Sequence, residues 1–160
     1  MALVFIGMGS SLNRLESINA GIASLQEEFS DVRISSLYES EAVGFIGGNF
    51  YNLVVECKTD LTVQSLISRL KAIEIQHGRT KNSIKFAPRT LDLDLLLYNQ
   101  LVDKKINLPR AEITQNAFVL KPLAELAPHL KHPVLDKTYQ TLWGQYPQEK
   151  QKLWKIEHHF

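Results

Sequence analysis

Hydrophobic and polar positions alternate with two different periods in the first third of the chain. Leu3 to Ile6 are consecutive apolar residues, and this short run predicts a strand. Val32 to Tyr38 and Phe50 to Cys57 predict two further strands. Between the first and the second strand, apolar residues recur at the spacing of one helical face: Leu15, Ile18, Ile22, Leu25 and Phe29. This part of the chain therefore predicts strand, helix, strand, strand.

A second helix and a fourth strand follow. The helix is expected to begin near Thr62, a good N-cap residue, and to end at Gly78, which suits a C-terminal cap. Its buried face is formed by Val63, Leu66, Ile67, Leu70 and Ile73. The strand comes next, around Leu91 to Leu97. The complete order predicts an α+β fold with a ferredoxin-like βαββαβ core, in which helices cover one face of an antiparallel sheet.

The remainder of the chain predicts a C-terminal addition to this core. A hairpin is expected across Asn99-Gln100, followed by a helix from about Asn116 to Leu126. Pro122 is a candidate break or kink in that helix. A short helix is expected around Thr138 to Gln145. With 160 residues and no recognisable linker, residues 1–160 are expected to form a single domain.

Composition narrows the class of protein. The chain is 44% hydrophobic, and its longest apolar runs are too short to span a bilayer. The N-terminal MALVFIGMGSS has no basic start, so it is expected to be a strand and not a signal peptide. Cys57 is the only cysteine, which excludes an internal disulfide and fits a packed residue in a cytoplasmic protein. The net charge of +1 argues against broad nucleic-acid binding, and a monomer is the simplest expectation.

Two carboxylates interrupt the last predicted strand of the core, in PRTLDLDLLLY at residues 88–98. Side chains alternate faces along a strand, so Leu91, Leu93, Leu95 and Leu97 are expected on one face. Asp92 and Asp94 then point to the other face, roughly 7 Å apart, together with Leu96 and Tyr98. Two neighbouring carboxylates repel each other and are costly to bury without a partner. A positive group is therefore expected between or beside them.

The segment before this strand carries only basic charges. From Gln76 to Thr90 it contains Arg79, Lys81, Lys85 and Arg89 and no acidic residue. One interpretation is a structural network of ion pairs between these cations and the two aspartates. The other is a site in which the aspartates hold Mg²⁺ and the cations bind phosphate oxygens, a division typical of phosphoryl transfer. Spacing alone does not decide between the two. Gly7-Met8-Gly9 lacks the spacing of a Walker loop and predicts a tight turn.

The same residues carry a resemblance to a known family. GRTKNSIKFAPRTLDLDLLLY, preceded by Ile73-Glu74 and followed by Leu108-Pro109 and AFVLKPLAELAP, resembles the 6-hydroxymethyl-7,8-dihydropterin pyrophosphokinases of folate biosynthesis. The segments IGMGSSL and FYN (residues 50–52) also match, so the resemblance extends over nearly the whole chain. It implies transfer of pyrophosphate from ATP to the pterin hydroxymethyl group, with AMP as the second product, by two Mg²⁺ ions bound to Asp92 and Asp94.

The resemblance also implies roles for individual residues. The catalytic set is Arg79, Arg89, Asp92 and Asp94. The residues expected at ATP are Glu74, Arg79, Lys81, Arg89, Leu95, Lys105, Asn107 and Arg110. The residues expected at the pterin are Ser40, Glu41, Val43, Phe50, Asn52 and Phe118. No nucleic acid or membrane partner is implied.

Several positions depart from the family pattern. Ser11 replaces a usual Asn, Phe86-Ala87 a usual Trp-Gly, and Arg110-Ala111 a usual His and ring or Pro. Asn116 stands where the family usually has Arg, so that Arg110 supplies a nearby guanidinium instead. Two alternatives stay open: a noncatalytic relative that binds nucleotide or pterin and, because a ferredoxin-like sheet is joined to a basic loop, a nucleic-acid-binding module.

Overall fold

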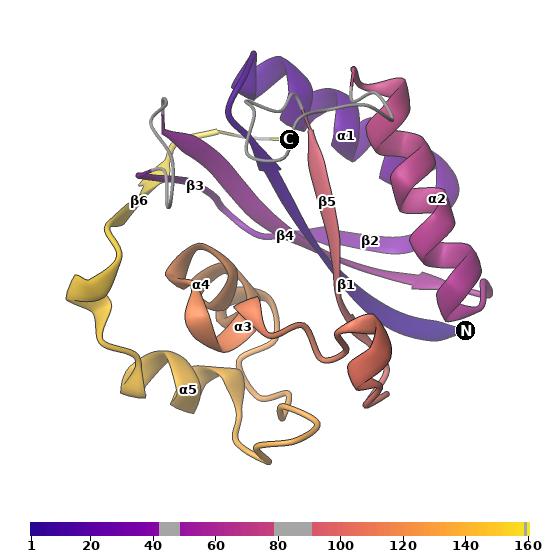
Figure 1. Cartoon of the computed structure of the whole chain (residues 1–160). Coiled ribbons are helices and arrows are strands. Elements are labelled where there is room, and N and C mark those ends of the chain that lie inside the picture. Colours follow the sequence, from indigo (N-terminus) through magenta and orange to yellow (C-terminus); the bar gives the residue numbers. More distant parts are fainter. Residues whose placement is uncertain (42–48, 79–90, 159) are drawn as a thin grey trace.

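The computed structural model of the protein describes residues 1–41, 49–78, 91–158 and 160 (Figure 1). The elements follow one another as β1 (Ala2–Ser10), α1 (Arg14–Glu28), β2 (Ser30–Ile34), β3 (Leu37–Ser40), β4 (Phe50–Thr59), α2 (Val63–Gln76), β5 (Asp92–Tyr98), α3 (Glu112–Gln115), α4 (Ala117–Leu126), α5 (Tyr139–Gln145) and β6 (Leu153–Ile156). Two short 3-10 helices, η1 (Lys104–Ile106) and η2 (Gln148–Lys150), lie before α3 and β6. None of the described helices has the length and apolar character needed to cross a membrane.

The strands form an antiparallel sheet in the order β5-β1-β4-β3-β6, and β2 also pairs with β4. Together with the helices this confirms the predicted mixed α+β fold with an antiparallel sheet. The single strand predicted over Val32 to Tyr38 is wrong, because the chain divides there into β2 and β3. The Ser35 N–H still donates to the Val54 carbonyl at 3.0 Å, but the Val54 N–H donates to the Ser35 hydroxyl at 2.9 Å, so a side chain supplies one acceptor of the ladder. β6 was not predicted at all.

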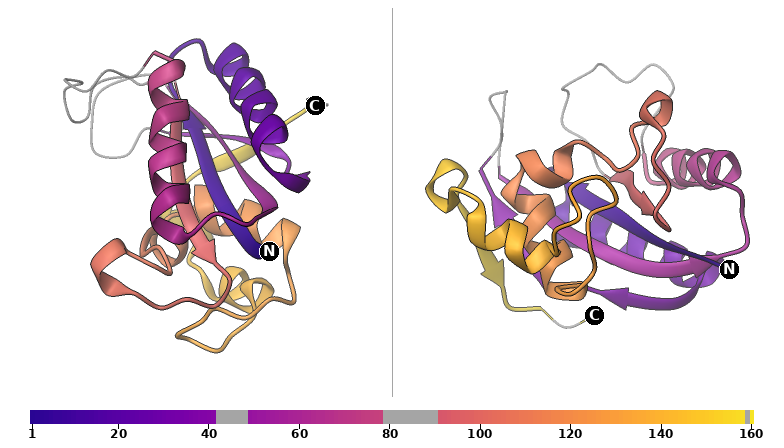
Figure 2. Two further views of the ribbon diagram at one scale, coloured as in Figure 1. Left: turned by 90° about the vertical axis from the view of Figure 1, so that its right-hand side faces the viewer. Right: turned by 90° about the horizontal axis from the view of Figure 1, so that it is seen from below.

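Helices cover both faces of the sheet (Figure 2). α1 and α2 pack on one face, over a buried cluster that includes Val4, Ile18 and Leu66. α4 and α5 pack on the other face, over a second cluster that includes Phe5 and Leu120. The predicted coverage of one face by helices is therefore correct for α1 and α2, but α4 and α5 cover the other face as well. Cys57 is buried within β4, as expected for a packed strand cysteine.

Helix termini and the proline in α4 test the local predictions. Thr62 is the N-cap of α2, and its hydroxyl accepts a hydrogen bond from the Ser65 N–H. Gly78 follows that helix with φ 100°, the left-handed conformation that glycine adopts at C-terminal caps. Of the break or kink predicted at Pro122, the break is not found, because α4 continues to Leu126. Pro122 is buried, and apolar packing of α4 offsets the hydrogen bond that the ring removes.

A β-bulge changes the predicted alternation in β5. Phe5 of β1 lies opposite Leu97, whereas the next residue, Ile6, lies opposite Leu95, so Leu96 is the extra residue. Leu93 and Leu95 belong to the cluster under α1 and α2, but Leu97 joins Leu96 in the cluster under α4. The prediction that Leu97 shares the face of Leu91 to Leu95 is wrong for this reason.

The predicted hairpin after β5 is also only partly present. Asn99 and Gln100 form a turn, but in the described chain no strand returns along β5. Instead the chain makes an isolated bridge between Asp103 and Leu108, and the Arg110 N–H then donates to the Leu96 carbonyl at 3.0 Å. This path brings Arg110 back beside the aspartate-bearing strand.

Candidate active site

Two glycines form a flat floor in the middle of the sheet. Gly7 and Gly9 lie within β1, so the predicted tight turn at this motif is wrong. A Cβ atom on Gly9 would lie 3.0 Å from Asn52 Oδ1, and one on Gly7 would lie 3.4 Å from a methyl group of Leu96. The space above these residues is thus open only because both lack side chains. Glycines two positions apart in a strand share a face, a signal already present in the sequence.

The register of the sheet places polar residues on both sides of this floor. Gly9 lies opposite Asp92 on one side and Asn52 on the other. Gly7 lies opposite Asp94. The two aspartates therefore do share a face, as the strand alternation predicts, and Asn52 faces the same side from β4. Residues from three adjacent strands meet at one surface.

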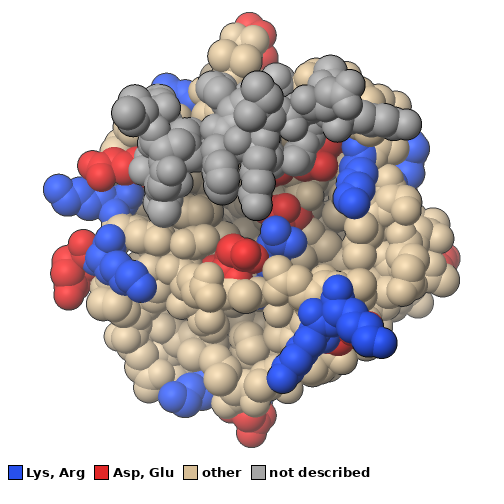
Figure 3. All heavy atoms as spheres, viewed as in Figure 1, with Lys and Arg blue, Asp and Glu red and all other residues tan. Residues whose placement is uncertain are grey.

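A cavity of about 290 Å³ lies over this floor, and we term it the sheet hollow. Its wall is formed by Gly7, Met8, Gly9, Ser40, Glu41, Phe50, Asn52, Leu53, Asp92, Asp94, Leu96, Arg110, Glu112, Asn116, Phe118 and Val119. It brings together five of the residues predicted for the pterin with both aspartates and Arg110. On the side of the molecule drawn in Figure 3, acidic and basic side chains lie next to one another near the centre.

The residues predicted for the pterin have a defined hydrogen-bond arrangement in the sheet hollow. The side-chain amide of Asn52 donates to the Ser40 hydroxyl at 2.9 Å, and both residues are buried. This bond fixes the amide so that Oδ1 lies toward Gly9, where it is an acceptor. Phe50 of β4 and Phe118 of α4 add aromatic surface from two separate elements. An aromatic, partly polar cavity of this kind suits a flat ring with donor groups.

A second cavity, of about 370 Å³, lies at the β5 edge of the sheet, and we term it the edge hollow. It is lined by Ile67, Leu70, Lys71, Glu74, Asp92, Leu93, Asp94, Leu95, Ile106 and Arg110. Asp92, Asp94 and Arg110 line both cavities. The aspartate pair therefore stands on the wall between two adjoining cavities, an arrangement that suits transfer of a group between two bound molecules.

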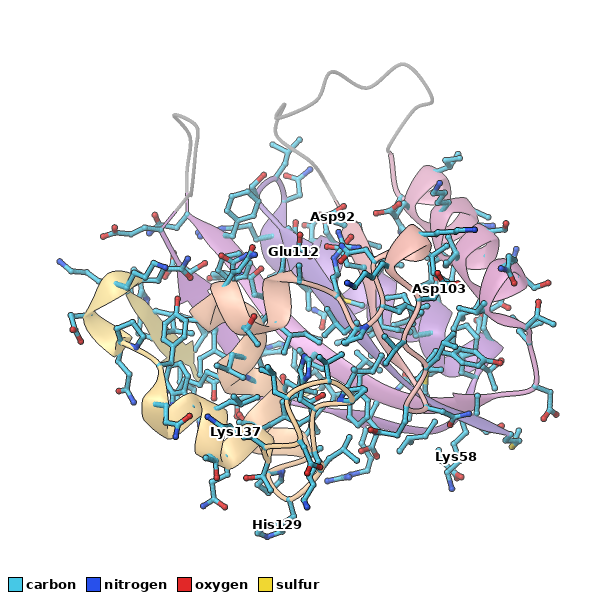
Figure 4. The ribbon with its side chains drawn as sticks, turned by 60° about the horizontal axis from the view of Figure 1, so that its bottom comes forward. Lys58, Asp92, Asp103, Glu112, His129 and Lys137 are labelled. Atoms are coloured by element: carbon cyan, nitrogen blue, oxygen red, sulfur yellow. The ribbon has the colours of Figure 1, made fainter. Side chains whose placement is uncertain are left out.

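The aspartates are held from α2 and from the segment before α3. The carboxylate of Glu74 is buried and accepts a hydrogen bond from the Leu93 N–H at 2.8 Å. The guanidinium of Arg110 lies 3.4 Å from Asp94 and 2.8 Å from Glu112, measured between nitrogen and oxygen. Asp92 and Glu112, both labelled in Figure 4, line the sheet hollow. Glu112 was not predicted, because its position at the site depends on how the chain brings Arg110 back to β5.

The donor chemistry of this wall fits a hard divalent cation that is shared with a substrate. Two carboxylates on one face are typical protein ligands for Mg²⁺. Within residues 1–41, 49–78 and 91–158, no group of three or more His, Cys, Asp or Glu side chains is gathered as a metal site. An ion held by Asp92 and Asp94 would therefore take its remaining ligands from water and substrate phosphates, as Mg²⁺ commonly does.

Other predicted residues are not brought into these cavities or cannot be placed. Leu95 lines the edge hollow, but Lys105 and Asn107 do not, although Ile106 between them does. Asn107 Oδ1 instead accepts a hydrogen bond from the Ala111 N–H at 3.0 Å. The predicted residues Val43, Arg79, Lys81 and Arg89 lie outside the described residues.

Comparisons with known proteins agree with the resemblance noted in the sequence. Residues 5–128 match the family model described as 7,8-dihydro-6-hydroxymethylpterin-pyrophosphokinase (HPPK). Named relatives are the 2-amino-4-hydroxy-6-hydroxymethyldihydropteridine pyrophosphokinases of Aquifex aeolicus and Bacillus subtilis. The Aquifex protein is 38% identical over 86% of this chain and 88% of its own, and the Bacillus protein is 32% identical over 78% and 77%.

A solved structure shows the same fold in a longer protein. The HPPK-DHPS of Plasmodium falciparum superimposes with a TM-score of 0.69 at 16% identity, over 91% of this chain and 43% of that one. This match shows a shared fold, and the family model and the curated relatives place the chain in the pyrophosphokinase class. On the family match and the identity to its relatives, this chain belongs to the 7,8-dihydro-6-hydroxymethylpterin-pyrophosphokinase family. The resemblance is confirmed.

Proposed function

We propose that the protein transfers pyrophosphate from ATP to 6-hydroxymethyl-7,8-dihydropterin, producing AMP and the pterin diphosphate, as a step in folate biosynthesis. Family membership supports this activity. The single structural observation that carries it is the wall of Asp92, Asp94 and Arg110 between two cavities. Such a wall lets one substrate lie on each side of the groups that handle the transferred phosphates.

The sheet hollow is the proposed pterin site. Asn52 offers its Oδ1 as an acceptor to ring N–H groups, because the bond from its amide nitrogen to Ser40 orients the side chain. Phe50 and Phe118 offer aromatic faces to the flat ring. The glycine floor allows the ring to approach the backbone of β1. Together these groups would orient the hydroxymethyl oxygen toward the aspartates.

The edge hollow is the proposed ATP site. Asp92 and Asp94 would hold two Mg²⁺ ions, which would supply charge stabilisation for the phosphates. Arg110 would bind a phosphate oxygen through its planar guanidinium, which is suited to such contacts. Glu74 is proposed to act through the strand, because it holds the Leu93 backbone between the two aspartates. Arg79, Lys81, Arg89, Leu95, Lys105 and Asn107 keep their proposed roles at ATP.

The chemistry requires no covalent enzyme intermediate. The pterin hydroxyl oxygen attacks the β-phosphorus of ATP, the bond from that phosphorus to the α-phosphate oxygen breaks, and AMP leaves. The protein's contribution is to align the two substrates and to stabilise negative charge. We also propose a ferredoxin-like core, supported by the order β5-β1-β4-β3, and a monomeric, cytoplasmic, single-domain protein.

The test is AMP formation from Mg-ATP with and without the pterin. We expect pterin-dependent AMP from the wild-type protein, and a loss of at least about a hundredfold in the double variant Asp92→Ala, Asp94→Ala. The control Glu16→Ala, Glu27→Ala removes the same charge from exposed positions of α1 and should keep the activity. A folded wild-type protein without pterin-dependent AMP would contradict the proposal and favour a noncatalytic relative.

A further inference from the structure

The two aromatic walls of the sheet hollow belong to different elements. Phe50 begins β4, whereas Phe118 is the second residue of α4. The width of the space between them therefore depends on how α4 is held relative to the sheet edge formed by β3 and the start of β4. A flat ring is sensitive to this width, because stacking weakens as the faces separate. The contacts that set this width are therefore important for the pterin site of the proposed function, on which this inference rests.

One residue of the C-terminal segment holds the start of α4. Gln151 Oε1 accepts a hydrogen bond at 2.8 Å from the N–H of Ala117, the first residue of α4. Its Nε2 donates to Asn116 Oδ1 at 2.9 Å. The side chain of Asn116 does not cap the helix, so Gln151 supplies that acceptor from a distant part of the chain. Phe118 follows directly after the bonded residue.

Three residues later the same segment holds the other wall. β6 pairs with β3, with Leu153 opposite Ser40 and Trp154 opposite Glu39. The indole N–H of Trp154 donates to Glu39 Oε1 at 2.8 Å. Because side chains alternate in a strand, Glu39 lies behind the sheet while Ser40 faces the sheet hollow. Trp154 thus holds β3, which carries Ser40, from the face of the sheet opposite to the sheet hollow.

Glu39 extends this brace to the beginning of β4. Its Oε2 lies 2.7 Å from Arg14, whose guanidinium also donates to the Asn49 carbonyl at 3.2 Å, next to Phe50. Burial alone would raise the pKa of the Glu39 carboxyl, but hydrogen bonds from Arg14, Trp154 and Asn49 outweigh it and hold the pKa below its usual value. Glu39 is therefore a charged acceptor on which several segments converge.

We propose that Gln151–Ile156 acts as a clamp that sets the width of the pterin slot, with Gln151 and Trp154 as positioning residues. Figure 1 shows this segment running from α5 along the side of α4 to β3. A cavity of about 430 Å³ remains between the segment and the walls, lined by residues including Ser40, Phe118 and Gln151. Beside this segment the walls thus face a cavity, while deeper in the molecule α4 and β4 pack together through Ala117 and Val54. The family match ends at residue 128, before this segment begins.

The test measures binding of the two substrates separately. Gln151→Ala and Trp154→Phe each remove one attachment, and each should weaken binding of 6-hydroxymethyl-7,8-dihydropterin roughly fivefold in the presence of a non-hydrolysable ATP analogue. Affinity for the analogue alone should change by less than about twofold, since neither residue lines the edge hollow. Matched controls are Gln148→Ala, on the exposed η2, and Trp143→Phe, on α5.

The double variant distinguishes a clamp from two independent contacts. If the segment sets the width only when both of its attachments are present, loss of either one has nearly the full effect. The double variant Gln151→Ala, Trp154→Phe should therefore weaken pterin binding little more than either single change. Unchanged pterin affinity in both single variants, with lowered thermal stability, would overturn the inference and leave the segment a purely structural role. Multiplied losses in the double variant would also overturn it. Pterin-dependent AMP formation by the wild type, measured first, tests the proposed function separately.

Discussion

The carboxylate of Glu74 in α2 accepts a hydrogen bond at 2.8 Å from the backbone N–H of Leu93, the residue between Asp92 and Asp94. Only 5% of Glu74 is exposed, so water cannot readily replace this acceptor. The bond joins a helix to an edge strand of the sheet. It therefore fixes the part of β5 from which both aspartates project.

Glu74→Ala should lower the free energy of unfolding by about 1–3 kcal/mol, because it leaves the buried Leu93 N–H without this acceptor. Glu74→Gln retains an amide oxygen in the same place and should lose much less. Urea denaturation measures both, with the exposed Glu16→Ala as control. Equal stability of Glu74→Ala and the wild type would show that this bond does not hold the strand.

The glycine floor predicts a selective effect on the pterin. A methyl group at residue 9 would lie 3.0 Å from Asn52 Oδ1 and would displace the amide. We expect Gly9→Ala to weaken pterin binding at least about fivefold, in keeping with the cost of overpacking. In Gly144→Ala the added methyl meets nothing within 4 Å on helix α5, so pterin binding should be unchanged. Calorimetric titration measures the pterin affinity of both variants. Equal affinities for Gly9→Ala and Gly144→Ala would show that the absence of a side chain at residue 9 is not needed for pterin binding.

The position of Arg110 predicts that both the charge and the planar shape of its guanidinium contribute to ATP binding. The guanidinium lies near both Asp94 and Glu112 on the wall shared by the two cavities. Arg110→Gln should weaken binding of an ATP analogue roughly tenfold. The affinity of Arg110→Lys should lie between those of the wild type and Arg110→Gln, because lysine keeps the charge but not the planar guanidinium. Arg33→Gln breaks a comparable ion pair with Glu56 elsewhere on the sheet and serves as control. Wild-type affinity in Arg110→Gln would exclude a phosphate contact.

His132 predicts a pH-dependent contribution to stability. Its Nδ1 accepts hydrogen bonds from the N–H groups of Val134 and Leu135, at 3.2 and 3.1 Å, which requires a neutral nitrogen. Burial lowers the pKa of the ring below its usual value of 6.5. The unfolded state therefore binds the proton more readily, and stability is lost as the pH falls below 6.5 toward the lower folded-state pKa.

The comparison of two asparagine variants isolates this effect. His132→Asn keeps an acceptor that does not titrate, so its free energy of unfolding should fall less than that of the wild type between pH 7 and pH 5. His129, which is exposed and directed away from the body of the protein in Figure 4, provides the control His129→Asn. Identical pH profiles for His132→Asn and the wild type would assign the acid sensitivity to other groups.

The sequence by itself determined the features that depend on local backbone periodicity. The apolar spacing of α1 and α2, the N-cap at Thr62 and the helix beginning after Thr138 are all encoded within a few residues. Alternation along β5 placed Asp92 and Asp94 on one face, because neighbouring side chains of a strand point in opposite directions. The sequence could also have identified the glycine floor, since Gly7 and Gly9 have the spacing of one strand face.

The tertiary structure alone decided the features that depend on a partner distant in the chain. The bulge at Leu96 arises from pairing with β1, and it moves Leu97 to the other face. β6 forms only because β3 presents a free edge to it. The contacts of Arg110 with Asp94 and of Gln151 with α4 require the chain to return from a distant position, and no local pattern specifies that path. Periodicity is a local property of the backbone, whereas the meeting of two walls is a property of the packed fold.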